Sequence, residues 1–120
     1  SVPYEYESVV IPYVKRPATY RPDFLLLRNG ILIESKGYFL AEDRTKHLLV
    51  KEQHPDLDIR FVFARPNTPL RKGSRTTYAA WAEKHGFPWA DRIIPVEWTK
   101  EPPEPRRVAA VEALRRASRK

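Results

Sequence analysis

The chain has 120 residues, 42% of them hydrophobic, which is enough for one domain with a single modest core. It holds no cysteine, so a disulfide framework and a thiolate metal site are both excluded. The formal net charge is +7, of which residues 106–120 contribute +5 and the first 105 residues only +2. A basic segment that binds an anionic polymer is one interpretation of this asymmetry, and a solvated terminus is the other.

The sequence also excludes a membrane-spanning segment, because no apolar run approaches the necessary length. The chain begins at Ser1 without methionine and without the charged-then-apolar pattern of a signal peptide. We therefore expect that the start of the protein is missing, cleaved or disordered, and that the protein has no membrane partner.

The first half of the chain reads as strands joined by turns. Residues 4–14 alternate apolar and polar side chains before becoming continuously apolar, which predicts one extended strand. Residues 15–20 are expected to be a connector. The pair Asn29-Gly30 is the strongest hairpin signal and joins predicted strands at 24–27 and 31–34.

A helix is predicted at 41–53, with Asp43 as the N-cap and a buried stripe of Leu48, Leu49 and Val50. Residues 59–63 (IRFVF) are β-branched and aromatic, as in a central strand. The rest is predicted, in order, as a loop at 64–75, a helix at 78–85 capped by Thr77, a core-covering segment at 87–99, a proline-rich linker and a basic helix at 108–118. A hairpin, a helix and a returning strand indicate an α/β fold with a mixed sheet flanked by helices.

Candidate chemistry lies around the predicted hairpin. A strand pair can bring Asp23 and Glu34 to one edge, and Lys36, two residues beyond Glu34, shares its face of the strand. Both carboxylates and the main-chain carbonyl of Ser35 suit a hard cation such as Mg²⁺, and Lys36 could orient or deprotonate an attacking water or stabilise the phosphate. The alternative is that Asp23 is a turn residue and that the other two are ordinary strand-edge charges.

Basic side chains in two places are candidate DNA contacts. The predicted loop at 64–75 is rich in cations and has no acidic residue, a mixture that suits phosphate contacts. The predicted helix at 41–53 offers a weaker set, in which pairing with acidic neighbours explains part of the charge. The candidates are Arg65, Arg71, Lys72 and Arg75 from the loop, and Arg44, Lys46 and His47 from the helix.

Longer stretches of the chain resemble a known family, the phage endonuclease I family of Holliday-junction resolvases, within the Pro-Asp…Glu-x-Lys nucleases. The strongest run is YRPDFLLLRNGILIESKG at 20–37. Further matching runs follow at 43–60, 72–74, 77–78, 83–86, 90–91, 94–95, 97–98 and 100–102. The resemblance is collinear over roughly residues 4–102, so it is more specific than the catalytic pattern alone.

The resemblance implies a restriction-endonuclease-like core in an intertwined, domain-swapped homodimer that resolves four-way and other branched DNA junctions. It implies a strand and inter-subunit bridge at 1–16 and a nuclease core at 17–101, while the proline-rich linker and basic tail at 102–120 are not part of the strong match. By similarity, Asp23, Glu34 and the Ser35 carbonyl bind Mg²⁺, with Mn²⁺ able to substitute and two ions per active site, and Lys36 is the catalytic lysine. It also implies 5′-phosphate and 3′-hydroxyl products, DNA recombination as the process, and the cytoplasm of an infected bacterium as the location.

One family residue has no counterpart here. The family supplies a further glutamate from a helix before the first strand, and this chain starts after that helix. Glu5 and Glu7 fall in the strand that follows, so neither takes that role. We expect that the full protein has residues before Ser1 that supply this glutamate; the alternative is that this form binds metal weakly and cuts poorly. Two alternative functions are a nuclease that cuts ordinary duplex and a non-catalytic junction-binding module.

Overall fold

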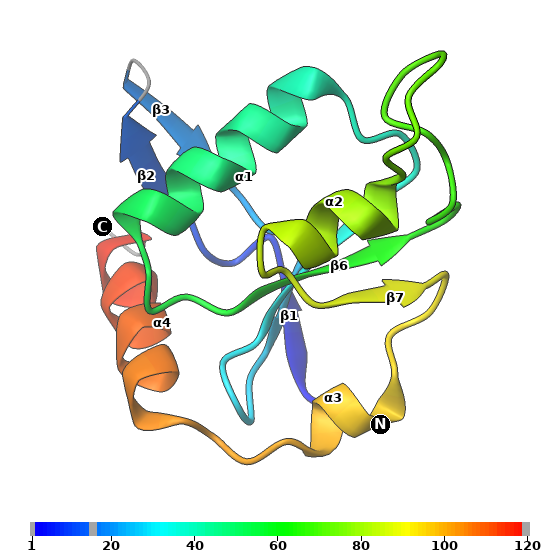
Figure 1. Cartoon of the computed structure of the whole chain (residues 1–120). Helices are drawn as coiled ribbons and strands as arrows, with labels where there is room; N and C mark the ends of the chain where they lie inside the picture. The colour runs from blue at the N-terminus through cyan, green and yellow to red at the C-terminus, as the bar shows by residue number, and fades with distance from the viewer. Residues whose placement is uncertain (1, 15–16, 119–120) are drawn as a thin grey trace.

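A five-stranded mixed sheet forms the centre of the molecule (Figure 1). The computed structural model describes residues 2–14 and 17–118. The strands of the sheet are β1 (Tyr4–Tyr6), β4 (Phe24–Leu26), β5 (Leu32–Lys36), β6 (Ile59–Phe63) and β7 (Trp89–Asp91), in the spatial order β1-β4-β5-β6-β7. Strand β4 is antiparallel to β1 and β5, whereas β6 is parallel to β5 and β7. The predicted α/β class and mixed sheet are confirmed.

The predicted hairpin is confirmed as β4 and β5. Phe24 pairs with Ile33 across the two strands, and Gly30 turns the chain with a φ of 80°. That left-handed conformation costs a glycine little. A side chain at Gly30 would also meet the Cα of Val108 at 3.5 Å, so the turn lies directly against the C-terminal helix.

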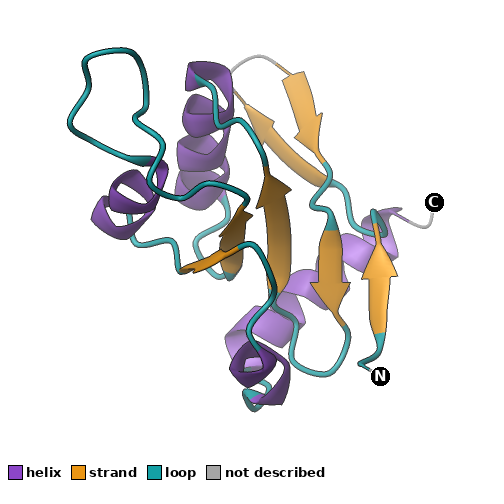
Figure 2. Ribbon diagram, turned by 90° about the vertical axis from the view of Figure 1, so that its right-hand side faces the viewer, coloured by secondary structure: helices purple, strands orange, loops and turns teal. Residues whose placement is uncertain are grey.

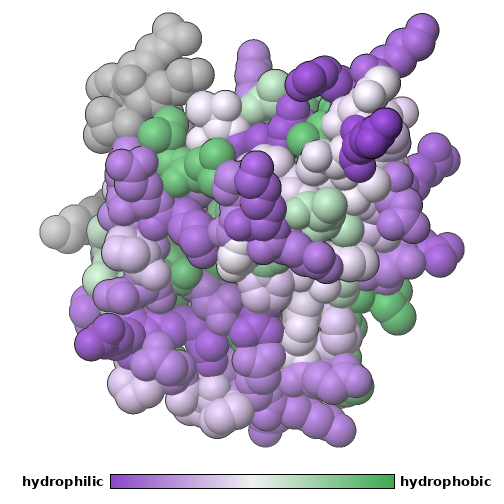
Figure 3. All heavy atoms as spheres, viewed as in Figure 1, coloured by the Kyte–Doolittle hydropathy of each residue, from purple (hydrophilic) through white to green (hydrophobic). Residues whose placement is uncertain are grey.

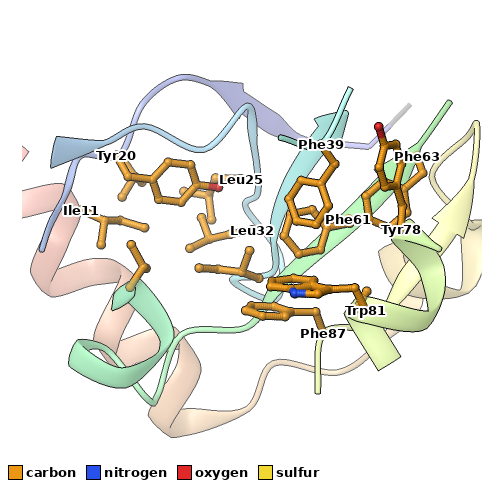
Figure 4. Close-up of a cluster of buried hydrophobic side chains, with 14 of the residues drawn as sticks. Ile11, Tyr20, Leu25, Leu32, Phe39, Phe61, Phe63, Tyr78, Trp81 and Phe87 are labelled. Atoms are coloured by element: carbon orange, nitrogen blue, oxygen red, sulfur yellow. The ribbon is translucent and has the colours of Figure 1, made fainter. Parts of the chain in front are cut away.

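The two faces of the sheet bury different cores. Leu32 and Phe61 point to the face that is covered by α1 (Ala41–Gln53) and α2 (Tyr78–Lys84), where aromatic and aliphatic side chains form the larger core cluster (Figure 4). Ile33, one residue along β5, points to the opposite face and joins a smaller cluster. This alternation follows from the two-residue period of a strand.

Helix α1 has the predicted span but a different N-cap. Leu40 occupies the cap position, and Asp43 lies in the first turn, where its Oδ2 accepts a hydrogen bond from the Leu40 backbone N–H at 3.4 Å. The prediction of Asp43 as the N-cap is therefore wrong. Its carboxylate still lies at the positive end of the helix dipole, and its Oδ1 lies 3.3 Å from Lys36 Nζ. Of the predicted buried stripe, Val50 is buried, whereas Leu48 and Leu49 are only half-buried.

The N-terminal region differs from the single predicted strand. The strand does not continue past β1: Glu7 has a φ of 50°, and the next strand, β2 (Ile11–Val14), begins four residues later. Strand β2 pairs with β3 (Pro17–Tyr20) in a second hairpin that lies apart from the main sheet (Figure 2). The predicted connector at 15–20 is thus partly a strand, and residues 15 and 16 lie outside the described part of the chain.

The C-terminal region is more structured than predicted. Strand β7 and the short helix α3 (Val96–Lys100) occupy the segment expected only to cover the core. Helix α4 (Pro105–Ser118) begins three residues before the predicted start, because proline is favoured at a first helical position. The face in Figure 3 is mostly hydrophilic. Within the described residues, no helix is long and apolar enough to cross a membrane.

Candidate active site

The register of the β4–β5 hairpin brings the two predicted acids together. Leu25 pairs with Leu32 and Phe24 with Ile33, so Asp23, one residue before β4, lies across from Glu34. The backbone N–H of Ser35 donates a hydrogen bond to Asp23 Oδ2 at 2.8 Å. The antiparallel pairing therefore fixes Asp23 beside the end of β5 that carries the Glu-x-Lys sequence.

Glu34 and Lys36 share one face of β5, as their spacing predicts. Lys36 Nζ lies 3.4 Å from Glu34 Oε2 and 3.3 Å from Asp43 Oδ1. Glu34 is only 6% exposed, and the Lys36 side chain between the two carboxylates is also largely buried, at 14%. Asp23, Glu34 and Lys36 thus form one cluster, and α1 contributes Asp43 as a second partner for the lysine.

Tyr20 makes one of two contacts at this cluster that the sequence did not predict. Its hydroxyl donates a hydrogen bond to Glu34 Oε1 at 2.8 Å. The partnership of Lys36 with Asp43 was also missed, because the position of Asp43 near the start of a helix suggested a capping role. The position of Tyr20 in the sequence does not indicate that its hydroxyl would reach Glu34, because this contact depends on the β2–β3 hairpin.

Burial controls the electrostatics of Glu34. Loss of water raises the pKa of Glu34, and the negative charge of Asp23 adds to this effect, while the Tyr20 hydrogen bond and Lys36 act in the opposite direction. Burial, followed by the charge of Glu34, raises the pKa of Tyr20 well above its ordinary value. Tyr20 therefore keeps its proton and acts as the donor.

The chemistry of the donors fits a hard divalent cation. Asp23 and Glu34 present carboxylate oxygens, the ligands that Mg²⁺ prefers, and their mutual repulsion would be relieved by a positive ion. In the described part of the chain, Asp23 Oδ1 has no hydrogen-bond or ion-pair partner, so it is available as a ligand. The described residues form no group of three or more His, Cys, Asp or Glu side chains suited to a metal. A cation would consequently depend on these two acids, the predicted Ser35 carbonyl and water.

The predicted loop cations are exposed and start beside the cluster. The loop leaves the end of β6, where the Ala64 N–H donates to the Lys36 carbonyl at 2.9 Å. Arg65, Arg71, Lys72 and Arg75 are all exposed. Arg65 also lines a surface hollow of about 400 Å³ that extends to Arg92. This side of the molecule can offer positive charge to a polyanion near the acids.

The three candidate DNA-binding residues on α1 differ in their contacts and burial. The Arg44 guanidinium donates to the Phe39 carbonyl at 2.6 Å, and Lys46 Nζ lies 3.6 Å from Asp43 Oδ1. His47 is 0% exposed and packs edge-on against Tyr20, with ring centroids 4.8 Å apart. Burial lowers the pKa of His47 well below its ordinary value. The prediction that His47 contacts DNA is wrong, because the side chain belongs to the core.

The basic C-terminal segment is partly an internal structural element. Arg107 Nη1 lies 2.9 Å from Asp58 Oδ2, and its Nε donates to the Asn29 carbonyl at 2.8 Å. Arg115 pairs with Glu5 at 2.7 Å. These arginines hold α4 against the sheet. Part of the positive charge of residues 106–120 is therefore paired within the fold and is not free to bind an anionic partner. Arg106 and Arg116 are exposed, and residues 119 and 120 lie outside the described residues.

The mixed sheet, with two acids and a lysine at the ends of adjoining strands, is an arrangement suited to phosphodiester cleavage and defines a nuclease-type α/β protein. The chain belongs to the phage endonuclease I family, whose profile matches residues 1–119. Endonuclease I of Escherichia phage T7 is 53% identical over 103 residues, which cover 84% of this chain and 68% of the relative. Endodeoxyribonuclease 1 of Enterobacteria phage T3 is 52% identical over 103 residues, covering 84% and 67%. The family resemblance is confirmed, and the chain is a nuclease of a bacteriophage family.

Proposed function

We propose that the chain is a metal-dependent endodeoxyribonuclease that resolves branched DNA, chiefly four-way (Holliday) junctions. The convergence of Asp23, Glu34 and Lys36 at one end of the hairpin is the observation that carries the chemistry. Two acids that suit a cation, together with an adjacent lysine, meet the charge requirements of phosphodiester hydrolysis. The preference for a junction rests on the family resemblance.

Asp23, Glu34 and the Ser35 carbonyl would hold the cation. When bound, Mg²⁺, or Mn²⁺ in its place, would neutralise charge on the scissile phosphate and acidify a water; two ions per site are proposed. Lys36 would orient or deprotonate the attacking water, or stabilise the phosphate, from its position 3.4 Å from Glu34. In-line attack of water on phosphorus with departure of the 3′ oxygen leaves 5′-phosphate and 3′-hydroxyl ends.

The exposed loop would position the DNA backbone near these groups. Arg65, Arg71, Lys72 and Arg75 lie on the segment that begins beside Lys36. Phosphate contacts of this kind orient nucleic acid without reading its sequence, which suits a nuclease that recognises the shape of a branch. Arg44 and Lys46, on α1, are proposed to contact the DNA backbone as well.

A homodimer would provide two such sites, one for each of two opposed strands at a junction. We propose that the bridge at 9–16 links two intertwined subunits and that the N-terminal strand swaps through it, so that pairing of β1 with β4 would occur between chains instead of within one. The protein would act in the cytoplasm of the infected bacterial host.

Competition between DNA structures tests this substrate assignment. A labelled four-way junction is bound without divalent ions and challenged with unlabelled junction or with linear duplex of the same length and sequence. The junction should compete much more strongly. Equal competition by the duplex would reject junction selectivity and favour the duplex-cutting alternative.

A further inference from the structure

We propose that Tyr20 is a positioning residue for Glu34, and that its hydroxyl sets the orientation in which this carboxylate meets a divalent cation. The inference rests on the proposed metal-dependent function and deepens it. Tyr20 would not touch the substrate or the reacting atoms; it would act through Glu34. Two observations support this role: the phenol ring is held in place by packing, and the two oxygens of Glu34 have different partners.

The Tyr20 ring is held from several sides. The residue ends β3, where it pairs with Ile11 of β2, and it is 3% exposed. The His47 ring packs edge-on against it at 4.8 Å, and Lys46 Nζ lies 4.9 Å from the ring centroid. Figure 4 shows the ring within the same buried cluster as Leu32 of β5. The position of the hydroxyl is therefore set by packing that does not depend on Glu34.

The two oxygens of Glu34 have different partners. Oε1 accepts the Tyr20 hydrogen bond at 2.8 Å, whereas Oε2 lies 3.4 Å from Lys36 Nζ. The terminal torsion of a glutamate has a broad minimum, so the carboxylate would turn more freely without the phenol. The hydroxyl thus fixes Oε2 on the side of Lys36. It also ties the β2–β3 hairpin to the candidate metal ligand.

A residue that hydrogen-bonds to a metal ligand normally has a strong effect on metal affinity. Removing a hydrogen bond to a ligating carboxylate typically costs about 10–100-fold in metal affinity or activity. We expect Tyr20→Phe to weaken binding of Mn²⁺ by roughly 10-fold, because the ring and its packing remain and only the hydroxyl is lost. Excess Mn²⁺ should restore most of the turnover, since the other ligands and Lys36 are unchanged.

The experiment compares Tyr20→Phe with Tyr78→Phe. Tyr78 is also buried, at 4% exposure, and packs against Phe39 and Phe63, but within the described residues its hydroxyl makes no hydrogen bond to Asp23 or Glu34. Binding of Mn²⁺ to each full chain is measured by isothermal titration calorimetry, below the unfolding transition of all variants. Junction cleavage is then measured across a series of Mn²⁺ concentrations, so that metal affinity and maximal turnover are obtained separately.

The expected result is a weaker Mn²⁺ affinity for Tyr20→Phe, an unchanged affinity for Tyr78→Phe, and recovery of turnover at high Mn²⁺. Equal Mn²⁺ affinity in Tyr20→Phe and the parent chain overturns the positioning role while leaving the proposed function intact. A parent chain that binds no Mn²⁺ overturns metal dependence itself, and the inference with it. A loss of turnover that excess Mn²⁺ does not restore also contradicts the inference.

Discussion

Arg107→Ala should destabilise the fold, because this arginine is a buried connector between α4 and the β4–β5 turn. Its guanidinium contacts Asp58 Oδ2 at 2.9 Å and the carbonyls of Asn29 and Pro102 at 2.8 and 2.9 Å. The residue is only 8% exposed, so water cannot readily replace these bonds. Asp58 keeps Arg60 as a second partner at 2.7 Å, which limits the loss.

The magnitude follows from these contacts. Hydrogen bonds to charged groups contribute about 1.5–3 kcal/mol each, and breaking a buried ion pair costs about 3–5 kcal/mol. Since Asp58 is not left unpaired, we expect a net loss of about 2–4 kcal/mol in the free energy of unfolding. At about 4 °C per kcal/mol for a domain of this size, the Tm should fall by roughly 8–16 °C.

The assay is thermal and urea unfolding followed by circular dichroism, with Arg116→Ala as the control on the same helix. Arg116 is exposed, so its removal should change the free energy of unfolding by no more than about 0.5 kcal/mol. Equal stability of the two variants would refute the conclusion that α4 is an integral part of the fold.

Three further predictions concern the site and its surroundings. Asp43→Asn should lower junction turnover about 10-fold, because Lys36 loses a carboxylate partner at 3.3 Å, while Glu42→Gln in the same turn should not; equal turnover of both variants would contradict this role. Lys72→Ala should reduce the slope of log affinity against log salt by about one, and an unchanged slope means that this side chain does not contact phosphate. Burial raises the pKa of Asp58, but the hydrogen bond and charge of Arg60 and the charge of Arg107 outweigh it and hold that pKa below its ordinary value of 3.8. The stability from Asp58 is therefore present above pH 3.8 and lost as pH falls through the lower folded pKa, so Asp58→Asn should flatten acid unfolding curves, and parallel curves would contradict the assignment.

Local patterns predicted the hairpin that carries the candidate site. Asn29-Gly30 indicates a tight turn, and the two-residue period then places Glu34 and Lys36 on one face. The span of α1 and the Thr77 cap of α2 were also predictable, because both depend on short-range signals. These features need little information from distant parts of the chain.

Contacts between distant segments were not predictable in the same way. Tyr20 reaches Glu34 only because β2 and β3 form a separate hairpin, and Arg107 reaches Asp58 across 49 positions of sequence. His47 is polar and was expected at the surface, but the packing of α1 places its side chain within the aromatic core. In each case the polar side chain has a partner or an environment that only the tertiary fold supplies.

A cleavage assay tests whether Asp23 and Lys36 are catalytic residues of this chain. A four-way junction is incubated with Mg²⁺ and either the parent chain, Asp23→Asn or Lys36→Ala, and binding of each protein to the junction is measured separately without divalent ions. We expect metal-dependent cleavage by the parent and loss of cleavage in both variants, with junction binding retained. Continued cutting by either purified variant would contradict it.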